Sequence, residues 1–537
     1  MPAPTRPRLS ALPFSILALG CGGGSPRGQP TTISEESPNS DAAAVLHVDA
    51  GTARDSATSH SLTSADAGPS SGDGGLDAAQ PAAFTLESTC ATAVVAGLQW
   101  QAPSQAATSY SVSRNGAALG STASTTYADT TVTPSTTFSY QVTALGAAGA
   151  VATSIRLAVT TSAASSQGDP AYCPSPFIKS MTWNWSSGFN QQNGSDLWPA
   201  TWGADGNVYT FFGDGGGFFG SDSLGRASFG IAVITGASPT VSASNASNLY
   251  GGLNAAHPST INGKSGSLIA VGSSFYAIGS IYRAGDSGGP SGAPGHSEIV
   301  YSEGNAYSWK DSSWSFCTAT DDPSGFCPGS FINYGKGNAG APDSYVYVMG
   351  TTAESFFSNT GVPGPAYTYL VRVPSTDVLT QAAYETYAGL DATGAPVWSA
   401  DLTQMQPIFT DHGPRPIGIG EAVFNPVLGR YIATGQGTIG QAAFYESVNP
   451  WGPWYSIGYY NTEADGTGGW GKFGLTTGTT GGDSLGINFV NAWTSADGAT
   501  MWAQFSSDGV APAEALLAPL AGKAFDSYSL VSVTLGL

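Results

Sequence analysis

The sequence is poor in charge. Only 10% of its 537 residues are Asp, Glu, Lys or Arg, and 17 basic residues stand against 37 acidic ones, which gives a net charge of −20. Binding to nucleic-acid phosphates needs a basic face and the release of counterions, so this balance excludes a nucleic-acid partner. An uncharged polysaccharide is a partner that fits the composition.

Long apolar runs and helical periodicity are also scarce. After the first twenty residues no stretch reaches the roughly 18 apolar residues that span a bilayer. Only residues 513–518, between Pro512 and Pro519, have the pattern of a short helix. By contrast, the chain has 72 glycines, and Thr, Ser, Tyr and Trp are frequent in its second half. This usage is typical of twisted sheets and turns, so the composition predicts an all-β protein.

The N-terminus has the pattern of a signal peptide. Two arginines and an apolar segment, residues 9–19, precede Cys21 in a box that resembles the cleavage site of bacterial lipoproteins, with Ala18 where Leu is usual. We expect residues 1–21 to direct export and Cys21 to carry a lipid that anchors the protein at the cell envelope. Plain cleavage would leave a secreted protein. Residues 22–82 contain almost nothing to bury and are predicted to be a disordered linker.

A second region, residues 83–165, alternates in short strands separated by turn residues. Its segments 98–100, 110–116 and 136–144 resemble strands B, C and F of a fibronectin type III domain. The resemblance implies a small β-sandwich to which we assign no catalysis. Phe138 stands where a corner Tyr is common in this family, so a hydroxyl hydrogen bond is expected to be missing there.

Four cysteines remain after Cys21, an even number in a chain expected to be exported, which predicts two disulfides. Cys317 and Cys327 frame a short loop, and Cys90 and Cys173 lie at the two ends of the predicted sandwich. We expect these two pairs to form. The spacings are not those of a zinc ribbon, so no metal site and no cofactor are predicted. A structural calcium ion and the oligomeric state are left open.

From about residue 170 onward an imperfect repeat occurs. A strand that carries aromatic residues recurs at intervals of 67 to 84 residues, with these markers: Tyr209, Tyr276, Tyr347, Tyr431 and Trp502. A second apolar strand follows each marker strand. Five such units predict a five-bladed β-propeller over residues 170–537, and a last strand at the C-terminus suits closure of the ring.

Two acids, Asp196 and Asp214, bracket the first marker strand, which we expect to be an inner strand beside the central channel. Paired carboxylates are what glycoside cleavage needs, because one protonates the leaving oxygen while the other attacks or activates water. The alternative is that both acids only cap turns. Glu421, before the fourth marker strand, is a candidate third acid, with a surface salt bridge or a turn as its alternative.

The segments around these acids resemble a bacterial family, long labelled only as a domain of unknown function, whose characterised members are endo-D-arabinanases. The resemblance runs from about residue 180 to residue 537. Its sharpest marks are Asp-x-Trp-Pro at 196–199 and Gly-Asp-Gly at 213–215. It implies an endo-acting glycoside hydrolase for D-arabinan or related furanosides, with Asp196 and Asp214 as the catalytic carboxylates.

Five further residues are assigned to substrate binding. Trp198 and Trp202 are candidate walls of sugar subsites, although blades also bury aromatic residues between sheets. Asn254, His257 and Lys264 precede the second marker strand and could bind hydroxyls or tune a carboxylate. A function of another class stays open, namely a non-catalytic propeller that binds surface carbohydrate or a protein. Turnover of a polysaccharide would separate the two.

Overall fold

The computed structural model describes residues 82–164, 169–192, 195–213, 215–220, 225–282, 296–316, 324–352, 366–391, 393–413, 417–436, 442–460, 484–507 and 527–537. Cys21, Asp214, Cys317 and the helix predicted at 513–518 lie outside these ranges. Within them the chain forms strands and four short 3-10 helices: η1 (Lys336–Asn338), η2 (Gln381–Ala383), η3 (Leu402–Gln404) and η5 (Asn491–Trp493). The all-β prediction is confirmed, while the predicted domain boundaries stay predictions.

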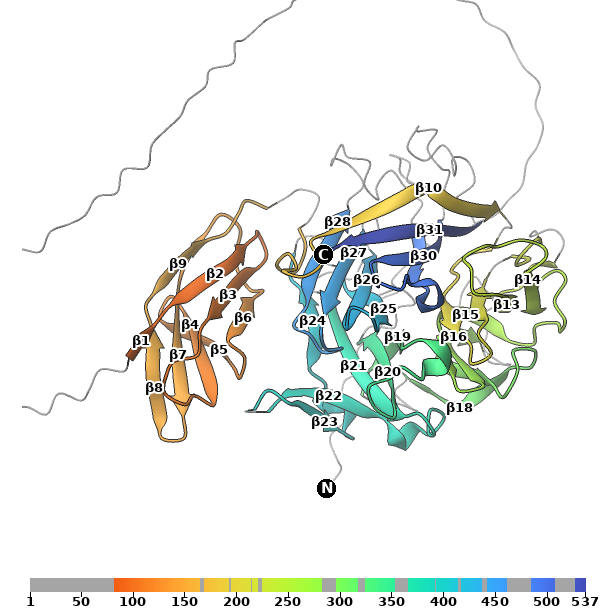
Figure 1. Ribbon diagram of the computed structural model, residues 1–537. Coiled ribbons are helices and arrows are strands. Elements are labelled where there is room, and N and C mark those ends of the chain that lie inside the picture. The colour runs from red at the N-terminus through yellow and green to blue at the C-terminus, as the bar shows by residue number, and fades with distance from the viewer. Residues whose placement is uncertain are drawn as a thin grey trace, which may run out of the picture. The chain divides into compact units, whose positions relative to one another are not determined.

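The first strands of the described chain form two sheets (Figure 1). One contains β1 (Ala82–Phe84), β8 (Gly149–Ser154), β7 (Thr137–Gly146), β4 (Ser109–Arg114) and β5 (Ala117–Thr122) in this order, with β9 (Leu157–Thr160) also paired to β7. The other contains β2 (Leu86–Ala91), β3 (Ala96–Trp100) and β6 (Thr126–Asp129). Alternate residues of β7 are buried, as expected for a strand with one face on a core. Trp100, Tyr110 and Tyr140 belong to that shared core.

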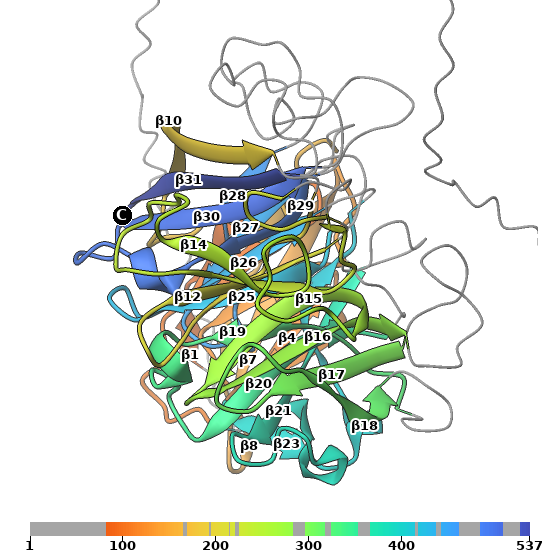
Figure 2. The same ribbon diagram turned by 90° about the vertical axis from the view of Figure 1, so that its right-hand side faces the viewer.

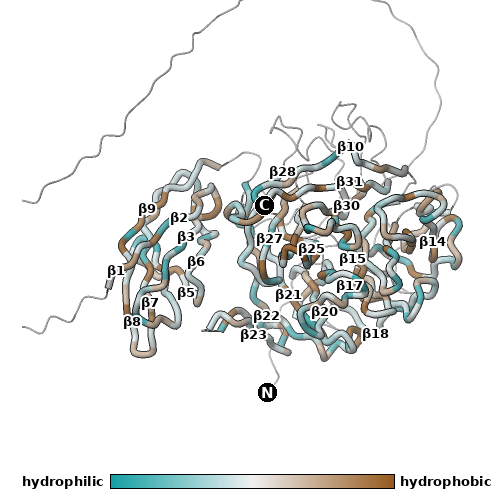
Figure 3. Tube along the Cα trace, viewed as in Figure 1, coloured by the Kyte–Doolittle hydropathy of each residue, from teal (hydrophilic) through white to brown (hydrophobic). Residues whose placement is uncertain are grey.

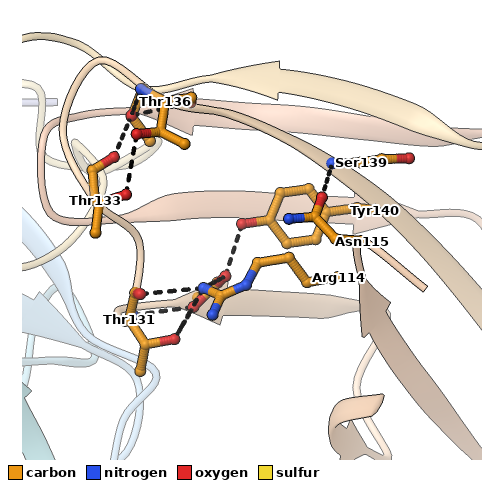
Figure 4. Close-up of polar contacts among 9 residues, drawn as sticks. Arg114, Asn115, Thr131, Thr133, Thr136, Ser139 and Tyr140 are labelled. Atoms are coloured by element: carbon orange, nitrogen blue, oxygen red, sulfur yellow. Dashed lines mark hydrogen bonds and ion pairs between the residues drawn. The ribbon is translucent and has the colours of Figure 1, made fainter. Parts of the chain in front are cut away.

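Two residues after Phe138, the hydroxyl of Tyr140 makes a hydrogen bond (Figure 4). Tyr140 is fully buried, and its hydroxyl donates to Asp129 Oδ2 at 2.7 Å. Arg114 pairs with the same oxygen at 2.8 Å. Burial raises the pKa of the Tyr140 hydroxyl, so it stays a donor. Phe138 packs its ring in the core, and the hydroxyl hydrogen bond of this region comes from Tyr140.

A disulfide joins Cys90 of β2 to Cys173, as the sequence predicts. The bond links two residues 83 positions apart and so closes a long loop that contains strands β3 to β9. Cys327 is also disulfide-bonded. Its predicted partner, Cys317, lies outside the described residues, so the pairing of these two stays a prediction.

The remaining strands form four sheets, three of four strands and one of ten. The ten-stranded sheet consists of two antiparallel ladders joined by the parallel pairing of β19 with β25, so the strands are described below as five sets, each with an antiparallel ladder. The first three are β11 (Ala200–Trp202), β12 (Val208–Phe212), β13 (Gly230–Ile234) and β14 (Ala246–Tyr250); β15 (Asn262–Val271), β16 (Ser274–Tyr282), β17 (His296–Ser302) and β18 (Lys310–Phe316); and β19 (Cys327–Asn333), β20 (Tyr345–Thr351), β21 (Ala366–Pro374), β22 (Glu385–Leu390) and β23 (Pro396–Ser399), with β24 (Pro407–Asp411) beside β21. The last two are β25 (Ile419–Asn425), β26 (Arg430–Gln436), β27 (Ala442–Ser447) and β28 (Tyr455–Tyr460); and β29 (Ser484–Phe489), β30 (Thr500–Ser507), β31 (Ser527–Gly536) and β10 (Ser180–Gln192). Figure 2 shows β15, β16 and β17 side by side.

The predicted repeat corresponds to the second and third strands of these sets. The marker strands are β12, β16, β20, β26 and β30, and the apolar strands after them are β13, β17, β21, β27 and β31. They are confirmed as strands. The expectation that the first marker strand is an inner strand is wrong, because β11 precedes β12 in its set.

The first strands of the five sets lie next to one another in chain order. β11 contacts β15, β15 contacts β19, β19 pairs in parallel with β25, and β25 contacts β29. Asn488 of β29 returns to β11, where the Ala200 amide donates to its Oδ1 at 3.2 Å. The five first strands therefore face a common centre.

Buried polar side chains hold these first strands together. Thr201 Oγ1 donates to Asn333 Oδ1 at 2.8 Å and accepts from the Ala270 amide at 2.9 Å. Asn491 Nδ2 in turn donates to the Asn333 carbonyl at 3.2 Å. Since buried polar groups are costly without partners, these satisfied contacts fix the relative positions of neighbouring sets.

Strand β10 is the first strand of this region in the sequence, yet it pairs antiparallel with β31, the last one. Its register runs from Ser180 opposite Gly536 to Gln192 opposite Ser527. Apolar residues, brown in Figure 3, interrupt the polar ones along many strands. They pack between neighbouring sets, as where Phe211 and Phe229 meet Leu268 and Val300.

Candidate active site

Asp196 lies just before β11 and is bonded to the far end of β12. Its amide donates to the Gly213 carbonyl at 2.9 Å, and the Gly213 amide donates to the Asp196 carbonyl at 3.1 Å. Gly213 is the residue before Asp214 in the sequence, although Asp214 itself is outside the described residues. A Cβ on Gly213 would come within 3.2 Å of Asp196 Oδ1. The glycine therefore leaves room for the carboxylate.

The glycine-rich segment after position 214 is held by the protein itself. The Gly217 amide donates to Ser195 Oγ at 2.9 Å, and the Phe218 amide donates to Asn248 Oδ1 at 2.8 Å. Asn248 is buried and also donates to the Gly216 carbonyl at 3.0 Å. At Gly217, where φ is +71°, a Cβ would lie 2.4 Å from Asn248 Oδ1. The backbone on both sides of position 214 is thus fixed by buried contacts.

The backbone directly after Asp196 is strained. Leu197 and Trp198 have φ of 78° and 63°, a region that non-glycine residues rarely adopt and that costs about 1–3 kcal/mol for each residue. Both side chains are buried, and the side-chain amides of Asn488 and Gln504 donate to the Trp198 carbonyl. Such conformations persist where the surroundings impose them, which is common at active sites.

Lys264 brings a positive charge to this position. It lies on β15 of the neighbouring set, with its Nζ 3.9 Å from Asp196 Oδ1. The two side chains are mostly buried, with 22% of Lys264 and 16% of Asp196 exposed, so solvent screens the pair only partly. An ammonium at this distance attracts a carboxylate. The structure brings together two of the residues that the sequence singles out.

Glu421 lies on β25, one of the first strands. A β-bulge between Ile419 and Glu421 shifts the register with β26, and such bulges redirect side chains. Burial raises the pKa of the Glu421 carboxyl well above its usual range. Glu421 lines a cavity that is also lined by Ala200 and Asn488, so it reaches the common centre of the first strands. The alternative of a surface salt bridge does not hold for it.

The two tryptophans do not form a sugar subsite beside Asp196. Trp198 is fully buried and packs against Phe212, Phe218 and Tyr528, so no face of its indole is left for a ligand. Trp202 pairs with Val208, five residues along β12 from Gly213, a distance of about 16 Å at roughly 3.3 Å per residue. The prediction for Trp198 is therefore wrong, and Trp202 lies at the opposite end of the strand from Asp196.

Asn254 and His257 are exposed side chains on the segment between β14 and β15. Asn254 has a φ of 60°, which suits a turn. The His257 ring lies 5.1 Å from the Tyr307 ring, and its backbone bonds to Leu249 and Gly251. These contacts are those of a surface loop residue.

The residues that sequence reasoning missed are the ones that hold the site: Ser195, Asn248, Asn488 and Gln504. Each is a polar residue within or beside an apolar strand, and each is buried. A polar residue in an otherwise apolar segment is the only sequence signal that could have indicated them. Asn488 and Gln504 donate to the Trp198 carbonyl of another set, 290 and 306 positions away. Ser195 and Asn248 accept from the Gly217 and Phe218 amides of their own set.

The residues that the structure describes contain no group of three or more His, Cys, Asp or Glu side chains able to hold a metal ion. They also contain no helix long and apolar enough to cross a membrane.

Comparisons with known proteins give only weak similarities. No family model matches the chain, and no curated protein matches it. Among solved structures, a glycoside hydrolase family 43 arabinoxylan arabinofuranohydrolase from Bacillus subtilis in complex with cellotetraose is 13% identical, with a TM-score of 0.32, over 65% of this chain and 64% of that chain. A fibronectin type III domain of the human fibronectin type III domain containing protein 3 is 20% identical, with a TM-score of 0.16, over 17% of this chain and 96% of its own.

A family 28 exopolygalacturonase from Yersinia enterocolitica is 16% identical, with a TM-score of 0.15, over 16% of this chain and 20% of that chain. The match thus spans a fifth of the exopolygalacturonase and less than two thirds of the arabinofuranohydrolase. Similarities as low as these do not establish a family for the chain.

Proposed function

We propose that residues 170–537 form a five-bladed β-propeller that hydrolyses glycosidic bonds in an uncharged polysaccharide, with D-arabinan or a related furanoside as the substrate class. The five sets of strands would be the blades, and the centre faced by β11, β15, β19, β25 and β29 would be the channel. The sequence motifs at 196–199 and 213–215 support the substrate class, and the net charge of −20 fits an uncharged polymer.

The observation that carries this proposal is the backbone pairing of Asp196 with Gly213. It places Asp196 beside the residue before Asp214, on strained backbone that buried side chains hold in place. A pair of carboxylates supplied by Asp196 and Asp214 would suit glycoside cleavage. Because the Lys264 ammonium lies beside Asp196, we assign Asp196 as the base or nucleophile. Asp214 would then protonate the leaving oxygen.

The test is turnover by the full chain. Reducing ends and product lengths are measured on D-arabinan, L-arabinan and other neutral polysaccharides. Asp196→Asn and Asp214→Asn should each cut turnover by about two orders of magnitude or more while leaving glycan binding nearly intact. Asp205→Asn is the matched control, because Asp205 lies in the turn at the other end of β12, where it accepts from Asn207 and Tyr209.

Equal turnover by the parent chain and both Asn variants would remove the assignment of these acids. Binding of a glycan without turnover by the parent would identify a non-catalytic binding protein instead.

We also propose that the protein is exported and anchored through a lipid on Cys21. The basis is the N-terminal sequence pattern alone. Incorporation of labelled fatty acid should occur in the parent and be absent in Cys21→Ala. Equal labelling of both proteins would contradict the anchor.

A further inference from the structure

The centre faced by the first strands contains a small polar cavity beside Glu421. Its volume is about 10 Å³, which is about the room that one water molecule needs. Glu421 and Thr434 face each other across β25 and β26 as paired residues, and both line the cavity. Asn333 and Asn488 line it from β19 and β29. The cavity therefore has the two to four polar partners that hold a water in place.

Among the residues that the structure describes, no positive charge faces Glu421 from the strands packed around it. β20, which also contacts β25, adds two tyrosines, Tyr345 and Tyr347. Arg430 is the described cation on β26, but it pairs with Asn425, four positions from Thr434, and bonds to Glu446 at 2.9 Å. Tyr431 on the same strand accepts a hydrogen bond from Tyr334. On β19 the titratable residue is Cys327, which is disulfide-bonded, and the described residues of β11 and β29 contain none.

No hydrogen bond or ion pair joins the Glu421 carboxyl to a residue that the structure describes. Glu421 is half-buried, and desolvation of its carboxyl without a compensating charge favours the protonated form and raises its pKa well above the usual range. A protonated carboxyl is a hydrogen-bond donor as well as an acceptor. Sugar hydroxyls need both kinds of partner.

We propose that Glu421 acts as a neutral carboxylic acid that, together with Thr434, hydrogen-bonds a sugar hydroxyl directly or through one water in the cavity. Glu421 is thus a binding residue of the site and donates no proton to the leaving oxygen. This inference rests on the proposed function for the nature of the ligand. It adds an alkaline limit to binding, because ionisation removes the donor and leaves an uncompensated charge in the channel.

The protonation state can be measured without activity. Infrared difference spectra of the parent chain minus Glu421→Gln at neutral pH should contain the carbonyl-stretch band of a protonated carboxyl. Glu303→Gln is the matched control, because Glu303 has 67% of its side chain exposed and pairs with Lys310. Its difference spectrum should contain ionised carboxylate bands. Carboxylate bands for Glu421 as well would overturn the proposal.

Binding gives the second test. In an Asp196→Asn background, which prevents turnover, affinity for an arabino-oligosaccharide is measured by calorimetry across pH. Affinity should fall by up to about tenfold per pH unit above the pKa of Glu421 and should stay level in the Glu421→Gln double variant, whose amide is still a donor. Glu421→Ala should weaken binding at every pH while keeping the thermal midpoint measurable.

The outcomes separate the two proposals. Affinity that falls with pH only when Glu421 is present supports this inference even if the parent chain shows no turnover, which would refute the hydrolase proposal alone. Loss of binding in Glu421→Gln at every pH, equal pH dependence in both proteins, or no oligosaccharide binding at all would overturn this inference.

Discussion

Asp411 should make the protein more stable in mild acid than at neutral pH. It is 1% exposed at the end of β24 and accepts hydrogen bonds from the Gly413 and Ile417 amides at 2.7 and 2.8 Å. Burial raises its pKa to about 6; the two amides oppose this, and Asp169 adds to it. The folded state therefore holds the Asp411 proton more tightly than the unfolded chain, whose Asp has a pKa of about 4. The contribution is fully present below pH 4 and is lost as pH rises through 6.

The rise in pKa corresponds to about 3 kcal/mol of unfolding free energy between these limits. Because burial raises the pKa values of Glu421 and Glu446 too, the measured quantity is the difference between the parent and Asp411→Asn. Urea unfolding is followed by tryptophan fluorescence from pH 4 to pH 8. Twelve of the 13 tryptophans follow Pro170, so the signal reports this region.

The parent should lose about 3 kcal/mol relative to Asp411→Asn over this range. A difference that stays constant within about 0.5 kcal/mol would show that Asp411 is already ionised in acid and would refute the reasoning.

Three further predictions follow from the site and the cysteines. Gly217→Ala should destabilise the protein by more than about 1 kcal/mol and lower turnover, because φ is +71° and a Cβ would overlap a buried amide; unchanged urea midpoint and turnover would contradict this. Lys264→Met should lower kcat about tenfold with an unchanged thermal midpoint, whereas the exposed control Lys310→Met should leave kcat unchanged. Equal kcat values for the parent and Lys264→Met would show that Lys264 has no part in the site. Mass spectrometry of the digested, non-reduced protein should find Cys317 linked to Cys327, and two free thiols would refute that pair.

The sequence predicts the strands that carry many apolar residues and misses those that do not. The markers of β12 and β16 stand out because these segments carry aromatic residues and are followed by a second apolar strand. β11 has three residues, Ala200–Trp202, too few for a period of two to be recognised. β10 is rich in Ser, Asn and Gln and pairs only through its distant partner β31. Its pairing cannot be inferred from local propensity.

The candidate site divides in the same way. Asp196 and Gly213 are close in sequence and are joined by the intervening β11–β12 hairpin, so a local motif predicts their proximity. The prediction for Trp198 is wrong because the sequence of a motif does not show whether its indole packs in a core or stacks on a sugar. Asn488 and Gln504 act across a separation of about 300 residues, as in the bond from Asn488 to Trp198. The amino-acid composition does not indicate such contacts.

The pairing of β10 with β31 determines when β10 can find its partner during synthesis. Ser180 pairs with Gly536, so the earliest strand of this region waits for a partner that is synthesised 356 residues later. At roughly 5–20 residues per second, that interval is about 20–70 seconds, during which both edges of β10 are open. A nascent chain that ends before residue 527 lacks β31, so β10 has no strand to pair with. The pairing of β10 therefore requires synthesis of the chain through β31.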